Sequence, residues 1–124
     1  MTPRTVRGRG AQARGVDAER LAAQALEREG WTIHARRLRT EAGEIDLVAE
    51  RDGLLAFVEV KARKTLADAA AALGPRQRAR LLAAGEAALA EHHDWGRAGV
   101  RFDVVVVDAS GQTRRIADAF RLET

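Results

Sequence analysis

The chain has 124 residues and no cysteine, and its 21 Lys and Arg against 18 Asp and Glu give a formal net charge of +3. This length fits one domain with a modest core. The lack of cysteine excludes disulfides and thiolate metal sites. No apolar run reaches the roughly 18 residues of a membrane helix, and no apolar signal region is visible. The sequence therefore predicts a cytoplasmic protein without membrane contact.

The surplus positive charge lies near the N-terminus. Residues 1–15 hold four arginines and no acid, so the rest of the chain carries a net charge of −1. This segment has no hydrophobic periodicity and contains three glycines, which predicts a flexible basic arm before a single domain over 16–124. Two interpretations of the arm stay open: a tail without a partner, and an arm that contacts nucleic-acid phosphates.

Hydrophobic spacing predicts a helix and a strand after the arm. The helix covers about 18–29, with Asp17 as its N-cap and apolar residues on one face. Gly30 is a stop signal. Trp31, Ile33 and Ala35 then alternate with polar residues, which indicates a strand.

The second half of the pattern indicates a mixed sheet. The continuous β-branched run near the end is typical of a strand covered on both faces, and Pro75 suits the first turn of a helix. The further elements expected are strands over 44–50, 54–63, 101–107 and 114–116 and a helix over 75–91. The order α-β-β-β-α-β(-β) predicts an α/β fold, a central mixed β-sheet flanked by helices.

The strands over 44–50 and 54–63 form a predicted hairpin whose register can be derived. Asp52-Gly53 is a strong signal for a tight type I′ turn, and a slip of one residue would expose the whole apolar face. In this register Asp46 lies opposite Glu59, and Glu44 lies opposite Lys61. The apolar face is expected to hold Ile45, Leu47, Ala49, Leu54, Ala56, Val58, Val60 and Ala62.

The polar face of this hairpin points to metal chemistry. Opposed β carbons lie about 5 Å apart, and two carboxylates at that distance repel unless a cation or proton lies between them. Mg²⁺ or Mn²⁺ with oxygen ligands would resolve the conflict between Asp46 and Glu59. Lys61 points the same way as Glu59 and could polarise a metal-bound water or stabilise developing charge. It is one of only two lysines beside 19 arginines, so a compact point charge is favoured there.

Two simpler interpretations remain open. The polar face could be solvated, with Glu44 and Lys61 as an ordinary cross-strand ion pair. Glu19 borders the apolar stripe of the first helix and could supply a third carboxylate to the site. It could equally be a first-turn acid that complements the helix dipole.

Two segments of the hairpin, together with an acid on the first helix, resemble the PD-(D/E)XK nucleases of the restriction-endonuclease-like superfamily. The segments are Gly43-Glu44-Ile45-Asp46-Leu47 and Phe57-Val58-Glu59-Val60-Lys61-Ala62-Arg63, and the acid is Glu19. More closely, the chain resembles the YraN-like family of bacterial proteins, related in fold to Holliday-junction resolvases. The resemblance covers about residues 15–120.

The resemblance implies roles for individual residues. Asp46 and Glu59 would be metal ligands together with the backbone carbonyl of Val60, Lys61 would be the catalytic lysine, and Glu19 would complete the site. Gln77, on the second long helix, is a further candidate. The chain departs from the family where Arg37 stands, since an Asn is frequent there.

Three hypotheses about function follow. The first is a Mg²⁺- or Mn²⁺-dependent endonuclease acting on DNA, with branched or flapped DNA among its substrates and a homodimer if the substrate is a symmetric junction. The second is a nucleic-acid-binding module of the same fold with weak, partner-dependent or no catalysis. The third is a protein-interaction domain. In the first two, phosphates would be held by Arg36, Arg37, Arg39, Arg63, Arg76, Arg78 and Arg80.

Overall fold

The computed structural model describes residues 10–65, 67–68 and 74–120. The elements follow the predicted order α-β-β-β-α-β-β, which confirms the predicted fold class, and the last strand is longer than expected. They are α2 (Gly10–Arg28), β1 (Thr32–Thr40), β2 (Gly43–Arg51), β3 (Leu54–Ala62), α4 (Pro75–Glu91), β4 (Gly99–Val107) and β5 (Thr113–Phe120).

The strands form one mixed sheet in the order β1-β2-β3-β4-β5. Only β3 and β4 run parallel among these neighbours, and the other three pairs are antiparallel. A parallel pair needs a long crossover connection, which here contains α4. Because β4 is an interior strand covered on both faces, its residues 102–107 are all buried, as the β-branched run predicts.

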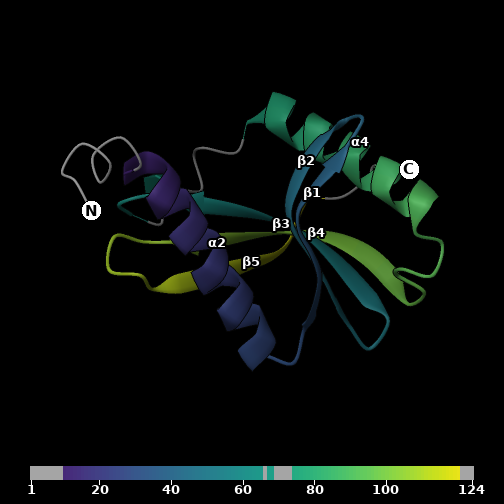
Figure 1. Ribbon diagram of the computed structural model, residues 1–124, viewed down its shortest axis with the longest axis horizontal. Coiled ribbons are helices and arrows are strands. Elements are labelled where there is room, and N and C mark those ends of the chain that lie inside the picture. The colour runs from purple at the N-terminus through teal and green to yellow at the C-terminus, as the bar shows by residue number, and fades with distance from the viewer. Residues whose placement is uncertain (1–9, 66, 69–73, 121–124) are drawn as a thin grey trace.

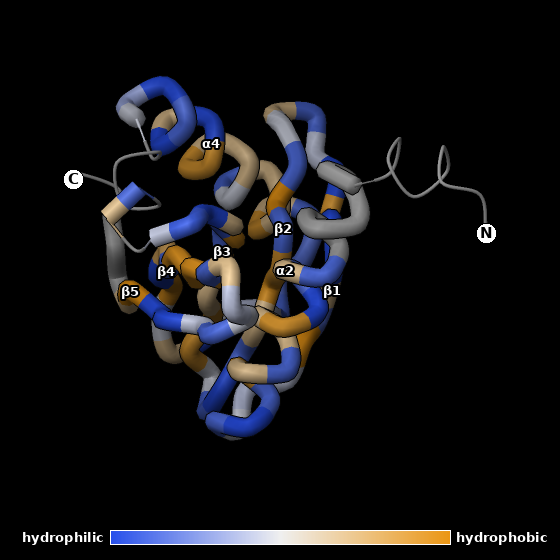
Figure 2. Tube along the Cα trace, turned by 90° about the vertical axis from the view of Figure 1, so that its left-hand side faces the viewer, coloured by the Kyte–Doolittle hydropathy of each residue, from blue (hydrophilic) through white to orange (hydrophobic). Residues whose placement is uncertain are grey.

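Two helices cover opposite faces of the sheet (Figure 1). On one face Ala22 and Leu26 of α2 pack on a cluster that includes Val58. On the other, Ala84 and Ala88 of α4 pack on a second cluster, built with the side chains of Val48, Leu55, Phe57 and Phe102. The hydrophobic colouring of Figure 2 is concentrated in the strands between the helices. No helix in the described part of the chain is long and apolar enough to cross a membrane.

The first helix begins earlier than the sequence predicts. It starts at Gly10, so the helix takes in residues 10–15 of the predicted flexible arm, and Asp17 does not cap it. Ala, Gln and Arg in this stretch are good helix formers, and an isolated Gly15 is tolerated at a cost of about 1 kcal/mol. Residues 1–9, the rest of the predicted arm, lie outside the described residues.

A β-bulge in β1 breaks the alternation expected from Trp31, Ile33 and Ala35. The pairing with β2 shifts register between Ile33 and Ala35. Ile33 therefore packs on the α2 side, whereas Ala35 packs on the α4 side. The prediction that these residues share a face is wrong at Ala35, because a bulge inserts one extra residue into the strand.

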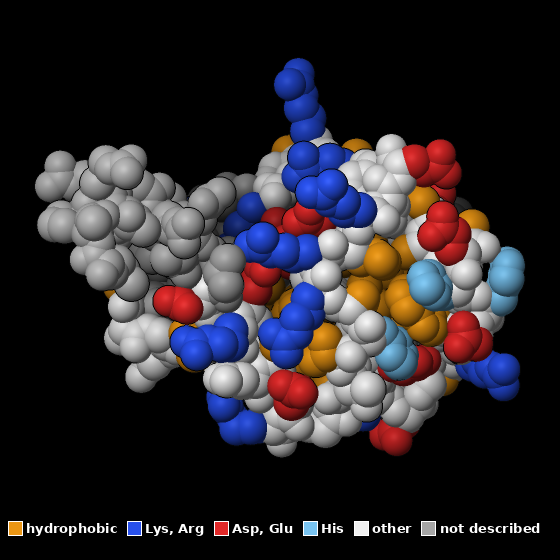
Figure 3. Space-filling view, viewed as in Figure 1, with side chains coloured by type: hydrophobic (Ala, Val, Ile, Leu, Met, Phe, Trp, Pro, Cys, Tyr) orange, Lys and Arg blue, Asp and Glu red, His pale blue; other side chains and the backbone are white. Residues whose placement is uncertain are grey.

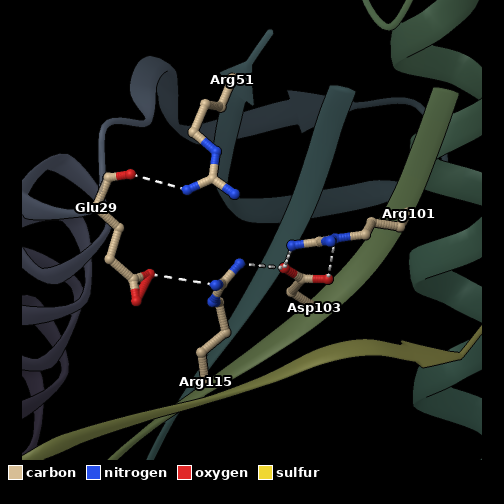
Figure 4. Close-up of polar contacts among 5 residues, drawn as sticks. All are labelled: Glu29, Arg51, Arg101, Asp103 and Arg115. Atoms are coloured by element: carbon tan, nitrogen blue, oxygen red, sulfur yellow. Dashed lines mark hydrogen bonds and ion pairs between the residues drawn. The ribbon is translucent and has the colours of Figure 1, made fainter. Parts of the chain in front are cut away.

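A group of ion pairs ties the C-terminal end of α2 to the sheet (Figure 4). Asp103 is fully buried and accepts hydrogen bonds at 3.0–3.5 Å from Arg101 and Arg115. Arg115 also pairs with Glu29 at 3.2 Å. Because a buried carboxylate needs such partners, we interpret Asp103 as a structural residue.

Candidate active site

The hairpin of β2 and β3 has the predicted turn and register. Asp52 and Gly53 have φ of 52° and 80°, the two positive values that a type I′ turn needs. Backbone pairing runs from Arg51 opposite Leu54 to Leu47 opposite Val58. The recorded pairing of β2 with β3 ends there, one step before Asp46 and Glu59 would face each other.

Asp46 lies where the two strands separate. Its Oδ2 accepts a hydrogen bond of 2.8 Å from the backbone N–H of Val60, so the carboxylate replaces a backbone acceptor on β2. The N–H and C=O of one strand residue point toward the same neighbouring strand. The carbonyl of Val60 is therefore expected to face the same opening as Asp46.

The alternation of β2 also changes at Asp46. Ile45 packs in the α4-side cluster, although Leu47, two residues on, packs on the α2 side. The prediction that Ile45 shares a face with Leu47 is therefore wrong. A regular strand would place both side chains on one face, so the strand is irregular between Ile45 and Leu47. Asp46, which contacts the backbone of β3, lies at this irregularity.

Glu59 and Lys61 form the second part of the site. Their side chains are only 10% exposed, and Lys61 Nζ lies 3.2 Å from Glu59 Oε1. Residues two apart on a strand point to one face, which explains the contact. Gln77 of α4 donates a hydrogen bond of 2.9 Å to the same Glu59 oxygen. The structure thus places the candidate Gln77 against Glu59.

The negative charge of Glu59 destabilises the charged form of Asp46. Burial, and next the negative charge of Glu59, raise the pKa of Asp46 to about 7, against the lowering effect of the Val60 hydrogen bond. Glu19 adds to this rise and Lys61 opposes it. A partly buried acid pair of this kind favours the uptake of a positive charge, either a proton or a cation.

Glu19 is oriented by an arginine. Arg37 Nε donates a hydrogen bond of 2.8 Å to Glu19 Oε2, which joins β1 to α2. This hydrogen bond is the main cause of a raised pKa for Arg37, and the charges of Glu44 and Asp46 act in the same direction. The sequence did not predict this contact, because it depends on the unusual backbone of Arg37, whose φ is 51°.

Glu44 does not pair with Lys61 in the structure. Its carboxylate lies 3.8 Å from Arg39 across the β1–β2 pair, and its side chain is 44% exposed. Lys61 is held by Glu59 instead. The simple cross-strand ion pair considered from the sequence is therefore wrong for these two residues.

The arginines predicted to hold phosphates are all exposed. They come from the end of β1, the end of β3 and the first turns of α4: Arg36, Arg37, Arg39, Arg63, Arg76, Arg78 and Arg80. The side chain of Arg80 packs against Gly43, since a Cβ there would lie 3.1 Å from Arg80 Cγ. This contact brings the start of α4 next to the turn between β1 and β2. Figure 3 shows Lys and Arg side chains gathered around acidic ones on one face.

The oxygen ligands that the carboxylate pair offers fit a hard divalent cation. Asp46, Glu59 and the Val60 carbonyl offer oxygen ligands, which Mg²⁺ and Mn²⁺ prefer, and the raised pKa of Asp46 indicates that a cation would relieve repulsion. Among the residues that the structure describes, no three His, Asp or Glu side chains gather closely enough to form a metal-binding group. Glu19 bonds Arg37 rather than joining the pair.

Comparisons with known proteins place this chain in a family. The profile of the uncharacterised protein family UPF0102 matches residues 18–107. A UPF0102 protein of Granulibacter bethesdensis is 63% identical over 120 residues, which are 97% of this chain and 76% of that protein. A UPF0102 protein of Azorhizobium caulinodans is 48% identical, with 98% and 93% covered. A third, of Rhodopseudomonas palustris, is 49% identical, with 86% and 82% covered.

The matched segment runs from α2 to the end of β4 and so includes Glu19, Asp46, Glu59, Lys61 and Gln77. The predicted relationship to the YraN-like family is confirmed: the chain belongs to the uncharacterised protein family UPF0102.

Proposed function

We propose that this protein is a divalent-metal-dependent endonuclease that hydrolyses phosphodiester bonds of DNA. The observation that carries the proposal is the partly buried pair Asp46 and Glu59 at the opening between β2 and β3, with Lys61 in contact with Glu59. The resemblance of the surrounding segments to PD-(D/E)XK nucleases supports it. Branched and flapped DNA are the first substrates to test.

Each residue has a role that follows from its chemistry. Asp46, Glu59 and the Val60 carbonyl would hold Mg²⁺ or Mn²⁺. Once bound, the ion would neutralise the scissile phosphate and lower the pKa of a water. Lys61 would orient the attacking water or donate a hydrogen bond to the negative charge that develops on the phosphate. Gln77 would hold Glu59 in place through the 2.9 Å hydrogen bond.

The exposed arginines would supply most of the affinity for DNA. Guanidinium groups bind phosphates well, and contacts to the backbone position a duplex without reading its sequence. Arg37, Arg39 and Arg80 come from segments that flank the acid pair. A symmetric four-way junction would need two active sites and therefore a dimer.

A cleavage assay with purified variants tests the proposal. Wild-type protein is incubated with labelled duplex, flap and four-way-junction DNA in Mg²⁺, Mn²⁺ or EDTA. We expect cleavage that needs metal, and a loss of at least about 100-fold in single-turnover rate for Asp46→Asn, Glu59→Gln and Lys61→Met.

Matched controls separate the site from general effects of charge. Glu86→Gln removes an exposed carboxylate of α4, and Lys64→Met removes the other lysine, which is also exposed. Both should keep a rate near that of the wild type. Cleavage that survives Asp46→Asn and Glu59→Gln would reject this site.

A DNA-binding module without catalysis is the second candidate. It is favoured by the absence of a three-acid group among the described residues, and by the internal partners of Glu19 and Glu59. This function predicts salt-sensitive binding of DNA with no turnover of any substrate. Failure to retard DNA at low salt would point instead to a protein-interaction domain.

A further inference from the structure

Arg37 has a backbone conformation that its place in a strand does not explain. It lies on β1, yet its φ of 51° is in the left-handed region, which is uncommon for a residue with a side chain. The conformation is therefore a strain that the surrounding structure must offset, and such residues cluster at functional sites. Arg37 is exposed and has no role in the hydrophobic clusters.

The side chain of Arg37 crosses from the sheet to α2. Its Nε donates a hydrogen bond of 2.8 Å to Glu19, whose side chain is only 18% exposed, while the Arg37 side chain is 51% exposed. Glu44 and Asp46 lie near enough to act on the same guanidinium through their charges. The positive charge of Arg37 thus faces Glu19, Glu44 and Asp46.

This arrangement gives Arg37 two competing partners. Like charges repel, so a guanidinium beside Glu19 and Asp46 opposes the entry of a second cation there. By holding Glu19, Arg37 also restrains the third carboxylate, whose charge acts on Asp46. Among the residues that the structure describes, Glu19 is the only hydrogen-bond partner of this guanidinium, and phosphate is a preferred partner of arginine.

We infer that Arg37 is an internal counter-cation of the acid site, which restrains Glu19 and weakens metal binding until a nucleic-acid phosphate takes its guanidinium. The inference rests on the proposed function, because it assumes a metal at Asp46 and Glu59. It adds a coupling between the binding of substrate and the binding of metal. A phosphate that displaces Glu19 from Arg37 would free the Glu19 carboxylate to join the metal site. Arg37 is a positioning residue in this scheme.

Calorimetric titration of the metal-free full chain with Mn²⁺ tests the first part. Arg37→Gln should bind Mn²⁺ at least about threefold more tightly than the wild type, because the repelling charge is gone. Arg37→Lys should stay near the wild-type affinity, since it keeps the charge and has the same cost at positive φ. Adding Glu19→Gln to Arg37→Gln should remove the gain. Arg36→Gln, which deletes the same charge one residue away, should have a smaller effect.

Nuclear magnetic resonance of the metal-free protein tests the second part. Titration with a short DNA duplex in EDTA should shift the Arg37 Nε–H signal as this hydrogen bond to Glu19 breaks. A signal that stays in place while the protein binds DNA would overturn the exchange with phosphate.

The outcomes separate this inference from the proposed function. Mn²⁺ binding that is lost in Asp46→Asn but unchanged or weakened in Arg37→Gln would overturn the inference and leave the metal site intact. A lack of Mn²⁺ binding by the wild type and by Arg37→Gln alike would reject the metal site itself, and the inference with it.

Discussion

At the scale of single residues, the site is a set of charged groups that each have at least one internal partner. Asp46 accepts from Val60, Glu59 contacts Lys61 and Gln77, and Glu19 accepts from Arg37. These contacts let the acids remain in place without a metal. They leave one group under electrostatic strain, because the pKa of Asp46 is raised by burial and by Glu59.

The raised pKa of Asp46 predicts how stability depends on pH. The folded-state pKa is about 7 against an ordinary value of 3.8, so folding takes up a proton between these pH values and the ionised carboxylate destabilises the fold above them. In EDTA, Asp46→Asn should be more stable than the wild type by about 2 kcal/mol at pH 8, and this difference should vanish near pH 4. Urea unfolding at several pH values measures it.

Asp94→Asn, at an exposed position after α4, serves as the control and should show no such trend. A difference between Asp46→Asn and the wild type that stays constant with pH would contradict the assigned pKa. Added Mn²⁺ should stabilise the wild type and not Asp46→Asn.

At the scale of elements, the position of α4 depends on one glycine. Gly85 is buried, and a Cβ there would lie 2.8 Å from Phe102 Cζ and 3.1 Å from Phe57. The helix therefore packs unusually close to the sheet. This close approach sets how far Gln77, two turns earlier on α4, reaches toward Glu59.

Gly85→Ala should destabilise the protein although alanine is the better helix former. Propensity alone would favour alanine by about 1 kcal/mol, but the clash with two aromatic rings should cost more and leave a net loss of about 1–2 kcal/mol. Gly74→Ala is the matched control, because a Cβ there meets nothing within 4 Å. Thermal unfolding of both variants tests this prediction. An increase in stability for Gly85→Ala would contradict it and show that α4 can move away from the sheet.

At the scale of the whole molecule, the net charge of +3 does not tell where positive charge lies on the surface. Four of the positive charges belong to residues 1–15, and the remaining chain is slightly negative. Lys and Arg side chains gather around acidic ones on one face (Figure 3), and under the proposed function this placement would attract DNA. Their effect is local and depends on salt.

The slope of DNA affinity with salt should report this placement. Replacing Arg76, Arg78 and Arg80 together by Gln should reduce the slope of log K against log salt by up to about 3, because each lost phosphate contact removes about 0.9. A control triple variant, Arg28→Gln, Arg97→Gln and Arg114→Gln, removes three exposed charges elsewhere and should change the slope less. Equal losses for the two triple variants would rule out a defined face.

The sequence by itself determined the parts of this protein that depend on local periodicity and turn chemistry. The Asp52-Gly53 turn, the start of a helix at Pro75 and the β-branched run of β4 each have a short-range physical cause, and each was predicted correctly. The segments around Asp46 and Glu59 also carried the family relationship.

The tertiary structure alone decided how the charged groups are partnered. The bulge at Ile33–Ala35, the reversal between Ile45 and Leu47 and the left-handed Arg37 all break strict alternation, and no local pattern specifies them. Those irregularities turn Asp46 toward β3 and bring Arg37 to Glu19, so the sequence identified the acids while packing determined which partners they have.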